Sequence, residues 1–188
     1  MLLSYYGDDF TGSTDAMEAM TAAAIDLEND LGRDVRGMAI QANTPGIVYR
    51  DLLILGTRLG EGPAPAAPGH IRAYNIRTGA LAWRRWTVPR RGEPGIETWQ
   101  GKEPIAGGGS TWLTGSYDAS TDTLYWATGN PWPDEDDRDR PGDNLYTNCV
   151  LALEPKTGAL KWHYQFTPHD VLDRDATEPN VLVDTVYK

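Results

Sequence analysis

Residues 73–83 read AYNIRTGALAW, and residues 152–162 read ALEPKTGALKW. Ala, Thr, Gly, Ala, Leu and Trp recur at a constant offset of 79 residues, since 152 − 73 = 79. Such self-similarity indicates an internal repeat, which must be recognised before any fold is chosen. We predict a β-hairpin in each copy, in which Thr78-Gly79 or Thr157-Gly158 supplies a turn with positive φ. The tryptophan on the outgoing strand, Trp83 or Trp162, should then pack between neighbouring sheets.

Two further short runs of strand-forming residues precede each hairpin. They lie at 47–49 and 52–55 before the first hairpin, and at 113–117 and 123–127 before the second. A repeated unit of four strands is typical of a β-propeller blade, so we predict an all-β fold. Blades run to about 40–50 residues, so an offset of 79 residues requires long insertions between strands. Segments 89–109 and 131–148 are the candidates, and loops of this length are often functional.

The composition is that of a folded domain with a hydrophobic core. Of the 188 residues, 40% are apolar and 23% charged, and the mean hydropathy is −0.49, which excludes disorder, collagen and a membrane span. Acidic residues outnumber basic ones by 27 to 17 and no basic stripe is present, so nucleic acid is not an expected partner. The single cysteine, Cys149, cannot form an internal disulfide.

The first 25 residues differ from the rest in their predicted secondary structure. Residues 14–25, TDAMEAMTAAAI, are strong helix formers that Thr14 or Asp15 could cap, so we expect a helix there. Short β-branched and aromatic runs follow, and we place a boundary between 1–25 and 26–188. Asp8 and Asp9 stand where a secretory signal would be apolar. As written, the chain is expected to have no export signal and to be cytoplasmic.

Four further motifs accompany the repeat: GGGSTWLTGSYD at 107–118, TGNP at 128–131, RPGDN at 140–144 and TPHDVLD at 167–173. With them, the chain from about residue 26 to 184 resembles the pyrroloquinoline quinone (PQQ) dependent alcohol and sugar dehydrogenases, glucose dehydrogenases among them. The resemblance implies a partial β-propeller, with two blades and the start of a third from a fold of eight blades. It also implies a periplasmic location and a cytochrome or quinone as electron acceptor.

The same resemblance implies roles for five residues. Trp112 matches the tryptophan that forms the floor under the flat quinone. Asn130 and Asp173 match an amide and a carboxylate ligand of the active-site metal, and Asp173 also matches the base that takes the alcohol proton. Glu61 is the candidate for a third ligand, and Asp175 resembles the extra carboxylate of lanthanide-using members. Because sugar-oxidising relatives also have an acid at this last position, calcium and a lanthanide remain equal alternatives.

Each assignment has a plainer alternative. Trp112 could be a core residue, Asn130 a turn residue before Pro131, and Asp173 a solvated loop acid. Many alcohol-oxidising members hold the quinone with a disulfide between adjacent cysteines, and this chain has no such pair. Two blades also leave their end sheets open, so self-association through blade edges is an alternative to a lone monomer.

A second resemblance concerns only the beginning of the chain. Residues 5–15, YYGDDFTGSTD, resemble the start of the four-carbon acid sugar kinases, although the chain has no GxxxxGK[ST] phosphate loop. Three hypotheses follow: a fragment of a quinoprotein dehydrogenase, a non-catalytic propeller scaffold, and a remnant of a sugar-acid kinase. We favour the first. We expect the isolated chain to bind PQQ and metal weakly or not at all, so whether it is itself an enzyme stays open.

Overall fold

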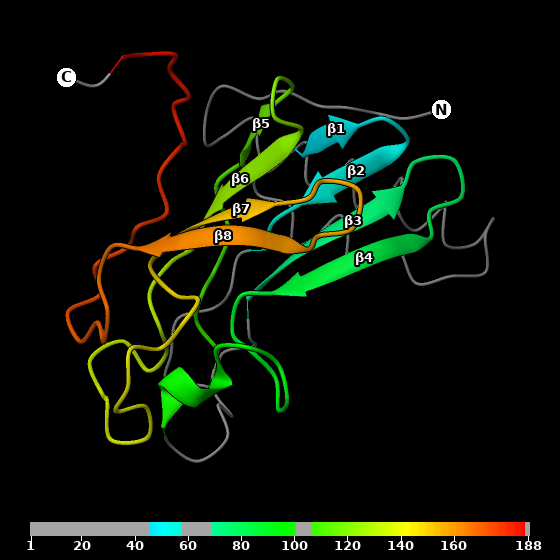
Figure 1. The fold of residues 1–188 in the computed structure, drawn as a ribbon. Coiled ribbons are helices and arrows are strands. Elements are labelled where there is room, and N and C mark those ends of the chain that lie inside the picture. The colour runs from blue at the N-terminus through cyan, green and yellow to red at the C-terminus, as the bar shows by residue number, and fades with distance from the viewer. Residues whose placement is uncertain (1–45, 58–68, 101–106, 187–188) are drawn as a thin grey trace, which may run out of the picture.

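The computed structural model describes residues 46–57, 69–100 and 107–186. These residues form two antiparallel sheets of four strands, each with its strands in chain order (Figure 1). The first sheet contains β1 (Ile47–Tyr49), β2 (Leu52–Leu55), β3 (His70–Asn75) and β4 (Leu81–Trp86). The second contains β5 (Ser116–Asp118), β6 (Thr123–Ala127), β7 (Cys149–Leu153) and β8 (Leu160–Gln165). The predicted all-β fold of propeller blades is confirmed.

The repeat forms equivalent hairpins in the two sheets. Ala73 pairs with Trp83 between β3 and β4, and Ala152 pairs with Trp162 between β7 and β8. Each hairpin has its register shift directly after that alanine. In each turn the glycine has a positive φ, and its N–H donates to a carbonyl four residues earlier at 2.8 Å. The turn chemistry common to both copies therefore produces the same hairpin twice.

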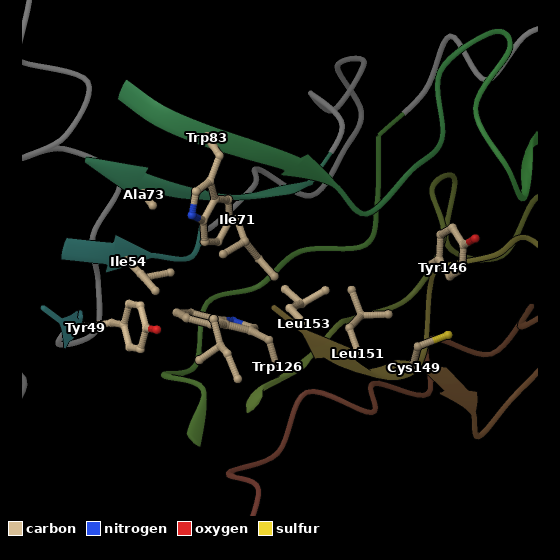
Figure 2. Close-up of a cluster of buried hydrophobic side chains, with 11 residues drawn as sticks. Tyr49, Ile54, Ile71, Ala73, Trp83, Trp126, Tyr146, Cys149, Leu151 and Leu153 are labelled. Carbon is tan, nitrogen blue, oxygen red and sulfur yellow. The ribbon is translucent and has the colours of Figure 1, made fainter. Parts of the chain in front are cut away.

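The hydrophobic core lies between the two sheets. Figure 2 shows the facing side chains meeting there. The buried cluster comprises Tyr49, Ile54, Ile71, Ala73, Trp83, Leu124, Trp126, Tyr146, Cys149, Leu151 and Leu153. Burial of these side chains is the main force that holds one blade on the other, because neither sheet covers its own apolar face.

Trp83 joins the first blade to the second. Its indole Nε1 donates to the carbonyl of Pro155 at 3.1 Å, and its ring lies directly over Gly158 in the turn before β8. Only 8% of Trp83 is exposed, whereas its repeat equivalent Trp162 is 48% exposed. The predicted packing of the tryptophan between sheets is thus found for Trp83, and the described residues do not bury Trp162 in the same way.

The two long insertions pack on each other beside the sheets. The first contains a short 3-10 helix, η1 (Ile96–Trp99), which the sequence did not indicate. Trp99 is buried, and its indole Nε1 donates to the carbonyl of Leu145 in the second insertion. The hydroxyl of Thr98 also accepts a hydrogen bond from the Leu145 N–H at 2.9 Å. These contacts join the described part of the first insertion to the second without long regular elements.

Two further expectations can be compared with the structure. The strand expected at 113–117 begins only at Ser116. The segment before it is hydrogen-bonded to the first blade, since Thr111 N–H donates to Thr57 O at 2.8 Å. The helix expected at 14–25 and the boundary at 25/26 lie outside the described residues. Within the described part of the chain, no helix has the length and apolar character needed to cross a membrane.

Candidate functional site at one end of the two sheets

The candidate site begins with the glycine-rich stretch that crosses from the first blade to the second. Gly69 N–H donates to Gly108 O at 2.9 Å, and Thr57 N–H donates to the hydroxyl of Thr111 at 2.7 Å. Ser110 adds a hydrogen bond from its hydroxyl to Thr57 O at 3.1 Å. These bonds join the end of β2 and the start of β3 to the segment before β5, and so fix the position from which Trp112 projects.

Trp112 meets the segment that follows β6. A Cβ added to Gly129 would lie 2.7 Å from the Trp112 ring and 2.8 Å from Asp175 Oδ1. The bare glycine therefore lets an indole and a carboxylate approach the same stretch of backbone. Gly129 is itself held between its neighbours, because its N–H donates to Ser110 O and its carbonyl accepts from Asn148 N–H, both at 2.8 Å. Trp112 is partly exposed beside this backbone.

Asn130 is buried, and its amide has a defined orientation. Its Nδ2 donates to Asp134 Oδ1 at 2.6 Å and to Pro131 O at 3.3 Å. An amide group has two N–H donors, so both are used and the Oδ1 atom is left as the acceptor. The backbone N–H of Asn130 also donates to Asp175 Oδ1 at 3.2 Å. Asn130, Asp134 and Asp175 thus belong to one small cluster.

Arg140 stabilises this cluster by binding the backbone next to it. Its buried guanidinium donates to Pro133 O at 2.7 and 3.0 Å, to Asp134 O at 2.9 Å and to Asn144 Oδ1 at 3.0 Å. Arg140 therefore holds the backbone of the residue whose carboxylate orients the Asn130 amide. This accounts for the motif at 140–144, to which the sequence had assigned no role.

The loop with the two candidate acids is anchored by a third acid. Asp170 is buried, and Asn148 Nδ2 donates to its Oδ2 at 2.8 Å. The backbone N–H groups of Leu172 and Arg174 donate to the same carboxylate at 3.0 and 2.6 Å. The Asp170 carboxylate therefore fixes the turn of residues 170–174 and links it to Asn148, the residue before β7.

The structure places the five predicted site residues differently from one another. Trp112, Asn130 and Asp175 come together around Gly129. Asp173 is exposed with φ 54°, and no hydrogen bond joins it to Asn130 in the described part of the chain. Glu61 lies outside the described residues. The common cavity that we expected for Asn130 and Asp173 stays a prediction.

Residues 46–57, 69–100 and 107–186 contain no cluster of three or more His, Cys, Asp or Glu side chains that could hold a metal. The predicted ligand set differs from such a cluster, because it includes an amide and the undescribed Glu61. Burial raises the pKa of the Cys149 thiol to about 12, so this side chain is a neutral core group and not a metal-binding thiolate.

Sequence reasoning missed the residues that position the site. Asp170 lies inside the motif at 167–173, but only Asp173 was singled out there. An aspartate that precedes two loop amides commonly accepts their hydrogen bonds, and this signal could have identified it. Asp134 stands in the acidic run 134–137, which has no feature that distinguishes one member from the others. Only its hydrogen bond with Asn130, four residues earlier, identifies it.

Sheets of four antiparallel strands, stacked by a tryptophan on the outer strand, define the described chain as part of a β-propeller. A family model described as the glucose, ethanol and alcohol dehydrogenase β-propeller domain, PQQ, matches residues 14–188. The chain therefore belongs to the PQQ-dependent dehydrogenase propeller family.

Individual relatives agree with this assignment. The chain is 41% identical to quinohemoprotein alcohol dehydrogenase ADH IIB of Pseudomonas putida, over 67% of this chain and 20% of that protein. It is 33% identical to methanol dehydrogenase [cytochrome c] subunit 1 of Paracoccus denitrificans, over 67% of this chain and 22% of the relative. A europium-containing methanol dehydrogenase structure superposes with a TM-score of 0.62 and 29% identity, over 70% of this chain and 26% of that one.

The chain thus spans between a fifth and about a quarter of the length of these relatives. The comparisons lend no support to the kinase resemblance of residues 1–25. The family model already begins at residue 14, within that segment.

Proposed function

We propose that this chain carries part of the active site of a PQQ- and metal-dependent dehydrogenase that oxidises an alcohol or sugar hydroxyl, and that the 188 residues alone are inactive. The observation that carries the proposal is the orientation of Asn130. Its amide nitrogen is committed to Asp134 and Pro131, which leaves the amide oxygen free to act as an acceptor, while its backbone N–H binds the Asp175 carboxylate next to Gly129 and Trp112. Oxygen ligands next to an aromatic face suit a hard cation and a flat cofactor.

The residues present fit the groups that the family requires. Trp112 would stack on the quinone, while Asn130 Oδ1 and the carboxylates of Asp173, Asp175 and Glu61 would bind the cation. When bound, PQQ supplies a two-electron acceptor and the cation supplies a Lewis acid. Asp175 adds negative charge that favours a trivalent ion, and the europium-containing relative supports a lanthanide at least as well as calcium.

Asp173 is our candidate for the general base. A carboxylate that takes the alcohol proton must be ionised and must reach the substrate hydroxyl. Asp173 is exposed on a loop whose backbone is fixed by Asp170, so its position is restrained while its side chain remains accessible to a substrate. The role of Asp170 is then to hold the base in place.

The remaining parts of the proposal rest on the relatives. The methanol dehydrogenase relative is named with cytochrome c, so a cytochrome is our candidate electron acceptor, with a quinone as the alternative. A periplasmic location is proposed on family grounds alone. We expect the isolated chain to be inactive because it spans only part of its relatives' length, blades are stabilised by their neighbours, and metal cages depend on a rigid scaffold.

The test combines cofactor binding, turnover and mass. The purified chain is mixed with PQQ and either calcium or lanthanum, and binding, dye-linked oxidation of alcohols and sugars, and sedimentation are measured. We expect weak binding by a monomer and no turnover. Tight binding by a monomer that Asp173→Ala abolishes would contradict the proposed inactivity. A non-catalytic scaffold would be favoured if Asp173→Ala and Asn130→Ala leave even the weak binding unchanged.

A further inference from the structure

A basic and aromatic pocket lies at the outer rim between the two blades. Residues 84–91, at the end of β4 and just after it, contain four of the 17 basic residues of a chain whose net charge is −10. Beside them is a cavity of about 230 Å³. It is lined by Arg84, Arg85, Trp86, Pro89, Glu93, Pro94, Tyr146, Thr157, Gly158 and Ala159. None of the candidate dehydrogenase residues contributes to this lining, so the pocket is independent of the function proposed above.

Aromatic rings hold the guanidinium groups around this pocket. Arg90 and Arg84 lie over the Trp86 ring, 4.2 and 5.0 Å from its centroid, and Arg85 lies 5.4 Å from the centroid of Tyr146. A guanidinium on a ring face keeps its N–H edges available for hydrogen bonds. The rings therefore restrain the guanidinium groups of Arg84 and Arg85, two residues that line the cavity, before any ligand arrives.

These positive charges are poorly compensated. No ion pair joins Arg84, Arg85 or Arg90 to another described residue, and Arg85 Nε is buried with no hydrogen-bond partner there. Glu93 is the acid in the lining, and its Oε2 accepts the backbone N–H of Arg90 at 2.7 Å. A buried donor without a partner destabilises the protein, and an anion in the pocket would relieve that cost.

The pocket is also lined by two uncharged hydroxyl groups, those of Tyr146 and Thr157. Burial raises the pKa of Tyr146, so its hydroxyl is protonated at neutral pH. Thr157 adds a hydroxyl to the lining. His163 stacks edge-on against Tyr146 at 4.9 Å, and its pKa is lowered by burial and by the charge of Arg85. The positive charge of the pocket therefore comes from arginines, and it persists across the neutral range.

We propose that this pocket binds a small tetrahedral oxyanion, either free phosphate or the phosphoryl group of a small molecule, through the guanidinium group of Arg85, whose buried Nε has no partner among the described residues. Guanidinium forks match the oxygens of such an anion and bind it through paired charge-assisted hydrogen bonds. The cavity is smaller than the roughly 300–1,000 Å³ of pockets for drug-sized ligands, which suits a compact group.

The test uses calorimetric titration of the 188-residue chain with inorganic phosphate, at constant ionic strength set with chloride. We expect saturable binding that weakens at least tenfold in the Arg84→Gln/Arg85→Gln double variant. Arg77→Gln is the matched control, because Arg77 is exposed on the same blade and pairs with Asp51, and it should bind as the wild type does. Single Arg85→Gln and Arg84→Gln variants, both at residues that line the cavity, keep the test valid if the double variant fails to fold.

The choice of ligands separates the two sources of the anion. Tighter binding of glycerol phosphate than of inorganic phosphate would identify a phosphoryl group on a small molecule, and the reverse order would identify the free ion. Equal affinity of wild type and double variant, or a heat signal no larger than that of chloride, would overturn the proposal. Binding of polyglutamate that phosphate fails to displace would also overturn it, in favour of an acidic protein partner.

Discussion

Gly158 offers a sharp test of how the two blades dock. Its φ is +71°, and an added Cβ would lie 2.4 to 2.9 Å from three atoms of the Trp83 ring. Alanine in this left-handed conformation costs about 1–2 kcal/mol. Overpacking a buried ring adds about 1–3 kcal/mol. We therefore expect Gly158→Ala to lower the free energy of unfolding by about 2–5 kcal/mol.

Gly92 supplies the matched control. Its φ is +84°, but nothing lies within 4 Å of an added Cβ. Gly92→Ala should therefore cost only the conformational part, about 1–2 kcal/mol. Urea unfolding followed by tryptophan fluorescence measures both variants. Equal destabilisation by the two substitutions would refute the docking of Trp83 on this turn.

Three further predictions concern individual buried or capped groups. Asp170→Asn should destabilise the chain by about 1–3 kcal/mol in thermal unfolding, since it removes the charge that accepts from Asn148 and from two loop amides, and no change would contradict that anchoring role. Hydrogen bonds from neighbouring hydroxyls hold the pKa of Asp118 at about 2, below its ordinary 3.8. The lowered pKa means that Asp118 stabilises the fold above about pH 4 and loses this effect as the pH falls towards 2, so the wild type should lose its advantage over Asp118→Asn in that range of an acid titration. Cys149 should resist a thiol reagent in the native chain near neutral pH and react after unfolding, and rapid native labelling would contradict its burial.

The hairpins were predictable because their determinants are local. The Thr-Gly turn and the tryptophan that follows it occur in both copies, and the first two strands coincide with the apolar runs at 47–49 and 52–55. The late start of β5 was not predictable, since it depends on a bond between Thr111 and Thr57, which are 54 residues apart. The short helix η1 likewise depends on contacts between two insertions.

The sequence named candidate site residues but could not give the contacts between them. Motif order brought Trp112, Asn130 and Asp175 into consideration, and these three meet around Gly129. The assignment of Asp173 as ligand and base stays a prediction. The contact that the sequence could not give is that of Asp175, which accepts from the Asn130 backbone N–H beyond the loop that Asp170 anchors.

We propose that Asn130 and Asp175 contribute to a cation site beside Trp112. Terbium luminescence excited through tryptophan measures this arrangement directly, because transfer to the ion requires an indole close to it. We predict sensitised emission at high terbium concentration that falls severalfold in Asn130→Ala, Asp175→Ala and Trp112→Phe, and persists in Asp136→Asn, which changes an exposed acid paired with Arg138. Emission that is absent in the wild type, or that all four variants retain equally, would contradict the site.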